Sequence, residues 1–454
     1  MCLGLKEPVE VVGLGASGIS SLRFLNEHGV KPGAMDTRAR LPTDLETQGL
    51  ETSELTLGGL DGARLLCAGT VVLSPGLSRA APAIAAAIDA GIEVIGDIEL
   101  FSRAANAPVV AITGSNGKST VTTMLRDMAA QAGLNVRAGG NLAPPALDLL
   151  SSREPDLYVL ELSSFQLEST QSLRPSAAIV LNFSEDHLDR YTGMAAYTDA
   201  KLRIFKGAER ALIGEQCLDE VSAAAIQARA EAQVQTLREG QPGAGEFGIG
   251  MHEGARWLMY GDTPLMAQSS LPVPGEHNAF DALAAWALGA TVGLDPASMR
   301  VALENFKGLP HRCELVANSG GVRWINDSKG TNVGASVAAI NGLAGDAGII
   351  LICGGEGKDA DFSPLADAVC QHVRELILIG RDAHLIEASV NTSIPRVHAA
   401  SMADAVSLAA RRARAGDCVL MSPACASFDM YDNYVVRGEV FRECVTATLK
   451  SGIC

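Results

Sequence analysis

Short runs of β-branched and aliphatic residues alternate with alanine-rich helical patterns from one end of this chain to the other. This alternation constrains the fold more than any other feature, because strand–helix–strand units build parallel sheets with helices on both faces. We therefore predict an α/β protein. The expected strands are Val9–Val12, Val71–Leu73, Val109–Ile112, Tyr158–Glu161, Ala178–Leu181, Val322–Ile325, Ile349–Cys353, Leu376–Ile379 and Cys418–Met421.

The length predicts several domains, because 454 residues exceed what one hydrophobic core usually supports. The pattern of strand, glycine turn and helix that opens the chain starts again near Ile112, and βα units resume near Pro310. We therefore predict three domains, at residues 1–96, 97–309 and 310–454.

The second block carries a stretch, Gln241–Gly261, that is rich in turn signals and has little helical periodicity. It predicts an insertion of loops and small strands. A helix pair, Asn278–Val292 and Pro296–Phe306, is expected to close this block, and a C-terminal helix is expected at Val436–Leu449.

Composition excludes several classes of protein. The formal net charge of −16 argues against a nucleic-acid partner, whose phosphates it would repel. The ten cysteines form no CxxC pair and no zinc-type cluster, so thiols such as Cys67, Cys217 and Cys353 are expected to be reduced. With no apolar stretch of signal-peptide or membrane-span length, we expect a cytoplasmic protein that does not insert into membranes. We also expect it to be a monomer.

The first glycine loop, Gly13–Gly18, follows a predicted strand and opens a helix, which suits a pyrophosphate at the helix N-terminus. Asp36 ends the next strand, about where a dinucleotide fold places its ribose-binding acid. This pattern fits a nicotinamide cofactor, another nucleotide or a plain tight turn, and the loop alone does not decide between them.

The second glycine loop, Thr113–Thr120, reads TGSNGKST after an apolar strand. Its backbone N–H groups, Lys118 and the hydroxyl of Ser119 would serve a triphosphate and its Mg²⁺. Ile112 stands where the strict Walker spacing has glycine, so the loop is a shortened variant. We predict a triphosphate site here in preference to a plain linker.

Polar residues follow the next two predicted strands, at the edge where open α/β sheets place their ligands. Glu161 ends one strand and is a candidate Mg²⁺ ligand, or alternatively a cap of the following helix. His187 lies in the segment Asn182–Arg190 and Lys201 on the helix that follows, and both residue types are also common on a solvated surface.

Taken in order, these segments resemble the Mur ligase family, and in particular its D-glutamate-adding branch, over nearly the whole chain. The segments that carry the resemblance are AITGSNGKSTVTT, GGNLAPPAL, YVLELSSFQLE, EDHLDRY, AKLRIF, GEHN, GLPHRCE, WINDSKGTN, GGEGKDADFSPL and SPACASFD.

The resemblance implies an N-terminal Rossmann-like domain for a UDP moiety, a central P-loop-type ATPase domain with a parallel sheet, and a C-terminal Rossmann-like domain for the incoming amino acid. It also implies an ATP-dependent ligase of peptidoglycan precursor synthesis that adds D-glutamate to UDP-N-acetylmuramoyl-L-alanine. ATP and two Mg²⁺ ions would be required, and the small-molecule substrates would be the partners.

The same resemblance assigns roles to individual residues. The UDP-sugar site would be lined by Ala16, Ser17, Asp36, Thr37, Arg38, Ser74, Gly76 and Asn141. ATP would be bound by Gly114, Ser115, Asn116, Gly117, Lys118, Ser119, Thr120, Asn278, Arg312 and Asp327. Metal ligands would be Ser119, Glu161, His187 and a carbamylated Lys201, and the catalytic groups would be Lys118, His187, Lys201 and Lys329. D-Glutamate would be held by Thr331, Lys358, Ser427 and Tyr434.

Some positions depart from the family pattern. Ala143 stands where glycine is common, Gly330 replaces a common alanine, and Tyr434 replaces a frequent phenylalanine. Asp281 occupies the place of an asparagine that would face the adenine, which puts that contact in doubt.

Three other classes compete with this interpretation. A nicotinamide dehydrogenase explains the first loop but leaves the GKST loop unused. A folylpolyglutamate-type ligase shares the ATPase core but fits the N-terminal domain poorly. A non-catalytic ATP switch does not need the polar residues gathered in the third block.

Overall fold

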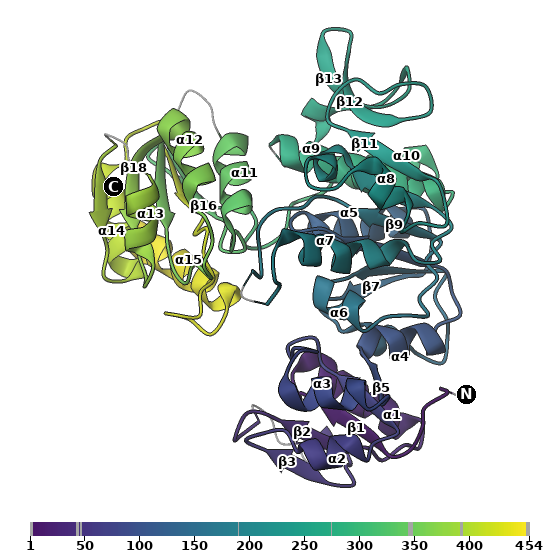
Figure 1. Cartoon of the computed structure of the whole chain (residues 1–454). Helices are drawn as coiled ribbons and strands as arrows, with labels where there is room; N and C mark the ends of the chain where they lie inside the picture. Colours follow the sequence, from purple (N-terminus) through teal and green to yellow (C-terminus); the bar gives the residue numbers. More distant parts are fainter. Residues whose placement is uncertain are drawn as a thin grey trace.

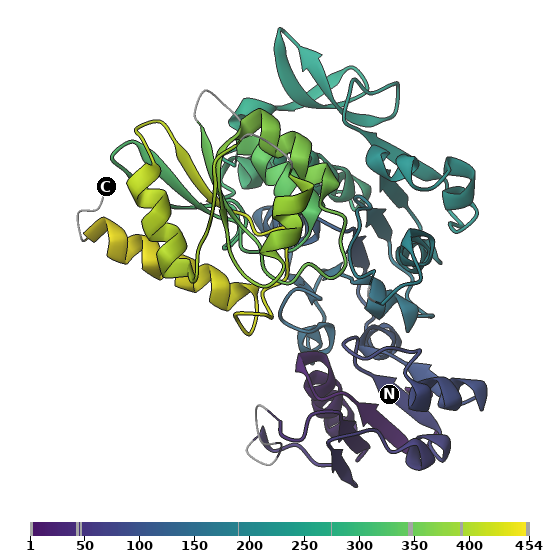
Figure 2. The same ribbon diagram turned by 60° about the vertical axis from the view of Figure 1, so that its left-hand side comes forward.

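The computed structural model describes residues 3–41, 45, 48–188, 190–273, 275–343, 348–390 and 394–450. Within these residues, the strands form three sheets, each in a lobe of its own, and the N-terminal and C-terminal lobes both adjoin the central one (Figure 1). The view turned by 60° shows the same arrangement, with the C-terminal lobe in front of the central lobe (Figure 2). The predicted α/β class with three domains is confirmed, whereas the boundaries at 96 and 309 stay predictions.

The N-terminal sheet is parallel throughout, with the strand order β3-β2-β1-β4-β5. Its interior is aliphatic, because every residue of β1 is buried. The elements are β1 (Val9–Val12), α1 (Ala16–Glu27), β2 (Gly33–Asp36), β3 (Leu55–Leu57), α2 (Gly62–Leu66), β4 (Thr70–Leu73), α3 (Pro82–Asp89) and β5 (Glu93–Ile95).

The central sheet has the order β14-β13-β12-β11-β10-β9-β6-β8-β7, which places the strand before the GKST loop, β6, between β9 and β8. The strands are β6 (Val109–Thr113), β7 (Val136–Gly140), β8 (Leu157–Glu161), β9 (Ala177–Val180), β10 (Ala211–Gly214), β11 (Val234–Arg238), β12 (Phe247–His252), β13 (Ala255–Tyr260) and β14 (Thr263–Ala267). The helices are α4 (Asp97–Ala104), α5 (Lys118–Gln131), α6 (Ser164–Glu168), α7 (Met194–Leu202), α8 (Ala223–Gln227), α9 (Glu276–Thr291) and α10 (Pro296–Glu304).

The stretch predicted as an insertion does contain strands, but they are not separate from the main sheet. β12 pairs parallel with β11, and β13 and β14 then extend the sheet edge as antiparallel strands. The predicted helix pair is present as α9 and α10, and both helices pack against α5.

The C-terminal sheet has the order β15-β16-β20-β17-β18-β19, antiparallel only at the β15–β16 pair. Its strands are β15 (Glu314–Ser319), β16 (Val322–Asn326), β17 (Ile349–Cys353), β18 (Val373–Leu378), β19 (Arg396–His398) and β20 (Cys418–Met421). Its helices are α11 (Val333–Leu343), α12 (Ser363–His372), α13 (Ala383–Ser389), α14 (Met402–Arg412) and α15 (Tyr434–Lys450).

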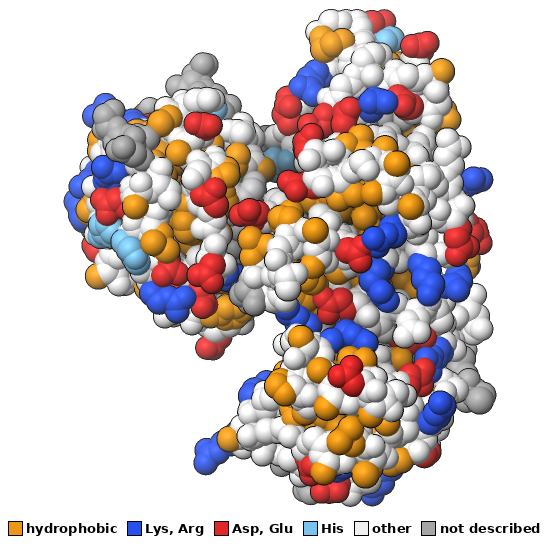
Figure 3. Space-filling model, in the orientation of Figure 1, with side chains coloured by type: hydrophobic (Ala, Val, Ile, Leu, Met, Phe, Trp, Pro, Cys, Tyr) orange, Lys and Arg blue, Asp and Glu red, His pale blue; other side chains and the backbone are white. Residues whose placement is uncertain are grey.

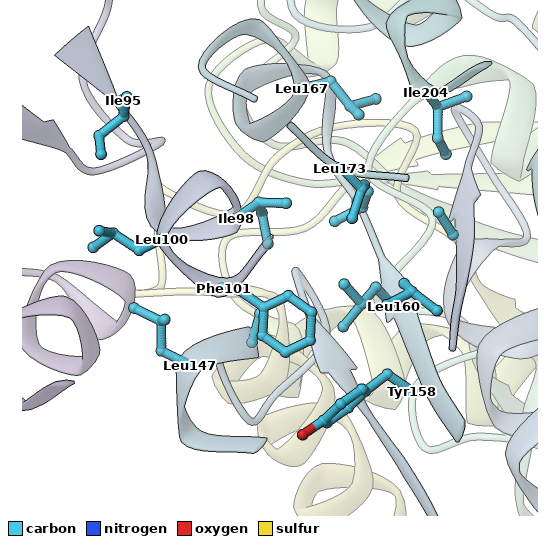
Figure 4. Close-up of a cluster of buried hydrophobic side chains, with 14 of the residues drawn as sticks. Ile95, Ile98, Leu100, Phe101, Leu147, Tyr158, Leu160, Leu167, Leu173 and Ile204 are labelled. Carbon is cyan, nitrogen blue, oxygen red and sulfur yellow. The ribbon is translucent and has the colours of Figure 1, made fainter. Parts of the chain in front are cut away.

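One hydrophobic cluster runs from the N-terminal lobe into the central lobe through α4 (Figure 4). The ring of Phe101 on α4 meets the ring of Tyr158 on β8 edge to face, with 5.0 Å between the centroids. Because aromatic pairs of this kind add to ordinary apolar burial, this pair holds α4 on the central sheet, and the contact of α4 with α1 joins it to the first lobe.

All the strands predicted from the sequence are present, with bounds that differ by a few residues at most. The predicted C-terminal helix is α15. Every helix in the described part of the chain is too short or too polar to cross a membrane.

Candidate active site

The glycine loop between β6 and α5 is shaped by its two glycines. Gly117 has φ +81°, and a Cβ there would come within 2.3 Å of Asp281 Oδ1. Gly114 has φ +156°, and a Cβ there would press on the Leu181 side chain. Lys118 bends back over the loop and donates to the carbonyls of Gly114 and Ser115 at 2.8 and 2.9 Å. Burial lowers the pKa of this ammonium, and it lies over the loop where a phosphate would be received.

Glu161 lies beside this loop, because β8 is the neighbour of β6. Its carboxylate accepts from Ser119 Oγ and from Asn141 Nδ2, both at 2.6 Å. Burial favours the neutral acid, but the charge of Lys118 and these hydrogen bonds outweigh it and lower the pKa. Glu161 is therefore an anion beside the phosphate loop.

The segment after β9, on the other side of β6, contacts the same loop. Asn182 accepts from Ser115 N and Asn116 N through its carbonyl and side-chain oxygens, at 3.0 and 2.9 Å. Farther along, burial lowers the pKa of His187 to about 4, so its imidazole is neutral at neutral pH. The His187 ring lies 4.8 Å from the ring of Phe165, measured between centroids.

Lys201 is the least expected member of this cluster, because its side chain is only 2% exposed. Its ammonium donates to Gly114 O at 2.8 Å, the carbonyl that also accepts from Lys118. Burial and the charge of Lys118 lower its pKa far below the ordinary value. Asp199, which lies two residues before Lys201 on α7, pairs with Arg229.

The C-terminal lobe presents its own strand ends to this cluster. Arg312 donates to Ser119 Oγ at 2.8 Å and so joins the two lobes at the phosphate loop. Lys329 lies 4.1 Å above the Tyr434 ring, and burial lowers its pKa to about 8. Asp327 accepts from Ser422 Oγ at 2.6 Å, and burial raises its pKa to about 6.

Two cavities open between these lobes, where Figure 3 shows the C-terminal lobe set off from the upper part of the central lobe by a notch. The smaller measures about 230 Å³ and includes, of the predicted site residues, Asn116, Gly117, Thr120, Asn278, Arg312, Asp327 and Lys329. The larger measures about 310 Å³ and includes Ser115, Asn116, Gly117, Lys118, Asn141, Glu161, His187, Lys201, Arg312, Lys329, Thr331, Lys358, Ser427 and Tyr434.

Asp281 lies in the wall of the smaller cavity, 6% exposed and against Gly117. Burial raises its pKa to about 7. Asp281 therefore lies next to the loop's glycine, and at neutral pH its carboxyl is partly protonated.

The N-terminal glycine loop lies away from both cavities. Asp36 accepts from Leu14 N at 2.6 Å and pairs with Arg38 at 2.7 Å, and this pairing lowers its pKa to about 2. Ser74 packs against the same loop, since a Cβ added to Gly13 would come within 2.8 Å of the Ser74 Cβ. Ala16 and Ser17 begin α1, and Thr37 and Gly76 follow β2 and β4. Asn141 lies apart from them and donates to Glu161.

Sequence reasoning missed residues that join the lobes. Asn332 and Asn116 exchange side-chain hydrogen bonds at 3.2 and 3.4 Å, and Asn332 also donates to Asp186 at 3.3 Å. Asp186 lies 3.6 Å from the ammonium of Lys358. Asp186 lies on the polar segment that follows β9, and Asn332 lies on the one that follows β16. Their position after a strand was the sequence signal that could have identified them.

Arg437 was also missed. It is 3% exposed and donates to the carbonyls of Ser328, Cys425 and Ala426 and to the Ser328 hydroxyl. It therefore ties the loop before Lys329 to the loop before Ser427. An arginine on a helix face looks like a surface residue in sequence, so no local pattern predicted it.

Among the described residues, no three His, Cys, Asp or Glu side chains come together in a group that could hold an ion. The anionic Glu161, the Ser119 hydroxyl and the neutral His187 nevertheless suit Mg²⁺ that takes its remaining ligands from phosphate and water.

A phosphate loop on the central sheet faces the strand ends of the C-terminal sheet across a shared cleft. This arrangement, in a chain of three α/β domains, defines a nucleotide-binding protein. Family models agree with this class: a Mur ligase MurD-like N-terminal domain matches residues 7–96, a Mur ligase middle domain matches 112–289 and a Mur ligase glutamate ligase domain matches 311–425. The chain belongs to the Mur ligase family.

Relatives extend over nearly the whole chain. A UDP-N-acetylmuramoylalanine–D-glutamate ligase of Nitrosococcus oceani is 49% identical, over 97% of this chain and 96% of its own. A protein of the same name from Marinobacter nauticus is 47% identical, over 96% of this chain and 97% of its own. The family resemblance predicted from the sequence is confirmed.

Solved structures share the fold at low identity. The UDP-N-acetylmuramate-alanine ligase of Thermotoga maritima matches with a TM-score of 0.60 and 17% identity, over 97% of this chain and 99% of that one. A MurF ligase of the same organism, in complex with ADP, matches with a TM-score of 0.60 and 14% identity, over 97% and 95%.

Proposed function

We propose that this protein is an ATP-dependent ligase that joins D-glutamate to UDP-N-acetylmuramoyl-L-alanine in cytoplasmic peptidoglycan precursor synthesis. One observation carries the proposal: the phosphate loop and the strand ends of the C-terminal lobe line one cavity, so an activated acyl group and an amine can meet there. Relatives named for this reaction support the choice of substrates.

The reaction needs activation, because an amine cannot displace oxide from a carboxylate. The substrate carboxylate attacks the γ-phosphorus of ATP, the bond to the β-phosphate oxygen breaks, and ADP leaves. The amine of D-glutamate then attacks the acyl carbon, the carbon–oxygen bond to phosphate breaks, and the ammonium loses a proton. The products are UDP-N-acetylmuramoyl-L-alanyl-D-glutamate, ADP and phosphate.

The cationic side chains around the larger cavity would stabilise the charge that moves in these steps. Lys118 and Arg312 approach the phosphate loop from two lobes, and Lys329 lies in the wall that both cavities share. Fixed cations that face developing negative charge lower the barrier because they need no reorganisation during the reaction. The buried Lys201 and the partly exposed His187 line the same space.

Two Mg²⁺ ions complete the proposed site. Ser119 and Glu161 would hold one ion and His187 with a carbamylated Lys201 the other. When bound, Mg²⁺ neutralises phosphate charge and orients the reacting oxygens.

The N-terminal lobe would bind the UDP moiety of the substrate. Its glycine loop at the start of α1 offers backbone N–H groups to a diphosphate. Ala16, Ser17, Asp36, Thr37, Arg38, Ser74 and Gly76 would line this site, with Asn141 reaching the acyl end from beside Glu161.

The third lobe would bind D-glutamate through Thr331, Lys358, Ser427 and Tyr434. Replacing Lys358 by Met removes one charge-assisted carboxylate contact, so we expect the KM for D-glutamate to rise about tenfold or more. The KM for ATP should change by less than about threefold, since Lys358 faces Asp186 rather than the phosphate loop.

Lys307→Met, which alters an exposed lysine before the third lobe, serves as the matched control. Equal increases in both KM values would remove Lys358 from the amino-acid pocket. Steady-state phosphate release with each substrate varied in turn measures both constants.

The folylpolyglutamate-type alternative has weaker support. The solved FolC of E. coli matches 78% of this chain with a TM-score of 0.57 and 17% identity, whereas the curated relatives cover 96–97%. The MurD-like N-terminal model further favours a sugar-nucleotide handle.

A single assay tests the proposed function. Phosphate release is measured with ATP, UDP-N-acetylmuramoyl-L-alanine and one amino acid at a time, among them D-glutamate, L-glutamate and L-alanine. We expect release only when ATP, the sugar nucleotide and D-glutamate are all present. Turnover with a reduced folate and L-glutamate instead would support the alternative and refute the proposal.

A further inference from the structure

Arg190 is a central-lobe residue whose side chain reaches the N-terminal lobe. Its Nη1 donates to Pro75 O and its Nη2 donates to Leu77 O, both at 2.9 Å. The side chain is only 14% exposed, so these bonds are largely shielded from water. Charge-assisted hydrogen bonds in such surroundings are among the stronger ones in proteins.

The two acceptor carbonyls alternate with residues of the proposed sugar-nucleotide site. Ser74, Pro75, Gly76 and Leu77 follow β4, and the Ser74 N–H donates to Val12 O at the end of β1. The Ser74 side chain also packs against Gly13 of the glycine loop. A guanidinium that holds Pro75 and Leu77 therefore fixes the loop on which Ser74 and Gly76 lie.

The other face of Arg190 is held from within the central lobe. Its guanidinium carbon lies 3.9 Å from the centroid of the Phe165 ring, a cation–π contact, and Glu168 lies 3.7 Å from Nη2. Phe165 also contacts the ring of His187, and it lines the larger cavity. The Arg190 N–H donates to His187 O at 2.9 Å, so both residues belong to one turn.

We propose that Arg190 is a positioning residue. It fixes the position of the first-lobe loop that carries Ser74 and Gly76 relative to the larger cavity of the site. The turn that presents His187 to the cavity presents Arg190 to Pro75 and Leu77. A sugar nucleotide held at Ser74 and Gly76 is thereby placed at a fixed distance from the phosphate loop. This inference rests on the proposed function for the identity of the ligand.

The test compares Arg190→Met and Arg190→Lys with Arg174→Met. Arg174 is a matched control, since its guanidinium also donates to two carbonyls, those of Gln171 and Leu173, but within the central lobe. For Arg190→Met we expect the KM for UDP-N-acetylmuramoyl-L-alanine to rise about tenfold or more and the KM for ATP to change by less than about threefold. A lysine ammonium lacks the planar fork with which the guanidinium reaches Pro75 O and Leu77 O from two nitrogens, so Arg190→Lys should fall between wild type and Met.

A rise in the KM for the sugar nucleotide without a matching rise in the KM for ATP distinguishes a positioning role from a general loss of structure. If Arg190→Met raises both KM values together, or leaves the sugar-nucleotide KM at the value of Arg174→Met, the inference is overturned.

Titration of each variant with UDP alone, measured by calorimetry without ATP, separates this inference from the proposed function. Weaker UDP binding to Arg190→Met than to Arg174→Met supports the positioning role of Arg190, even if the wild-type protein shows no ligase turnover. Equal UDP binding by the two variants, or none by wild type, overturns it.

Discussion

The two glycine loops have the same local plan, a strand, a glycine turn and a helix, yet their surroundings differ. Around Gly13–Gly18, Asp36 at the end of β2 pairs with Arg38 and accepts from Leu14 N. Around Gly114–Ser119, two lysines donate to the same carbonyl oxygen, and a buried carboxylate and an arginine from another lobe contact Ser119.

This difference indicates which loop does chemistry. At the first loop Asp36 and Arg38 neutralise each other, which suits a site that binds a ligand without reacting with it. At the second loop, Lys118 and Lys201 are buried side by side, and burial lowers the pKa of both. Such perturbed pKa values are concentrated at functional sites. Under the proposed function, the same turn would bind the sugar nucleotide in one lobe and form the reaction site in another.

The largest expected effect comes from removing the ammonium at the second loop. Lys118→Met should lower kcat by about a hundredfold to a thousandfold, because the lost cation neutralises charge that grows in the transition state. Thermal melting should stay native-like, because the change removes a buried charge without opening the core.

Lys206→Met, which alters an exposed lysine of the same lobe, controls for charge. If Lys118→Met melts like wild type and keeps full phosphate release, the second loop is not the reaction site and the comparison between the loops fails.

The second prediction concerns Lys201, which is buried beside Lys118. The lowered pKa favours the neutral amine, and a neutral amine adds to CO₂ to give a carbamate and a proton. The resulting anionic oxygen would suit Mg²⁺. Lys201→Ala should therefore lose most activity and regain part of it when acetate or a short-chain acid is supplied.

Lys118→Ala provides the contrast for Lys201→Ala, since added carboxylates cannot replace a cation. Labelled bicarbonate followed by NMR should show a carbamate carbon in wild type and not in Lys201→Ala. An unmodified lysine in wild type, together with no rescue by carboxylates, contradicts the carbamate.

Much of the fold was predictable because it depends on local patterns. Apolar runs such as Ile349–Cys353 are buried on both faces of a parallel sheet, so their sequence alone marks them as strands. The strands β12 to β14 were harder to interpret, because they lie at a sheet edge where polar and apolar residues mix.

The candidate site was predictable where a residue directly follows a strand. Glu161 ends β8, and Lys118 and His187 lie on the segments that follow the neighbouring strands β6 and β9. Arg190 and Arg437 act across lobes or between loops, and their partners are backbone carbonyls distant in sequence. No spacing rule identifies such contacts, so only the structure shows them.

The smallest expected effect lies at the first loop and tests whether it is only a handle. Asp36→Asn keeps one acceptor for Leu14 N but loses the charge that pairs with Arg38. The pKa of Asp36 is lowered from 3.8 to about 2, so the unfolded chain binds this proton more readily than the folded one. The stability gained is thus complete above about pH 4 and is lost as the pH falls through 2. It amounts to at most about 2 kcal/mol, because Arg38 is partly exposed and the pair is screened.

Urea unfolding should show a lower free energy of unfolding for Asp36→Asn than for wild type at pH 7, and this difference should narrow toward pH 3. Asp89→Asn, at an exposed position of the same lobe, should show no such difference from wild type. At saturating sugar nucleotide, kcat should stay within about twofold of wild type, since no reacting charge faces this loop. A loss of kcat as large as that of Lys118→Met would mean that the first loop takes part in the chemistry.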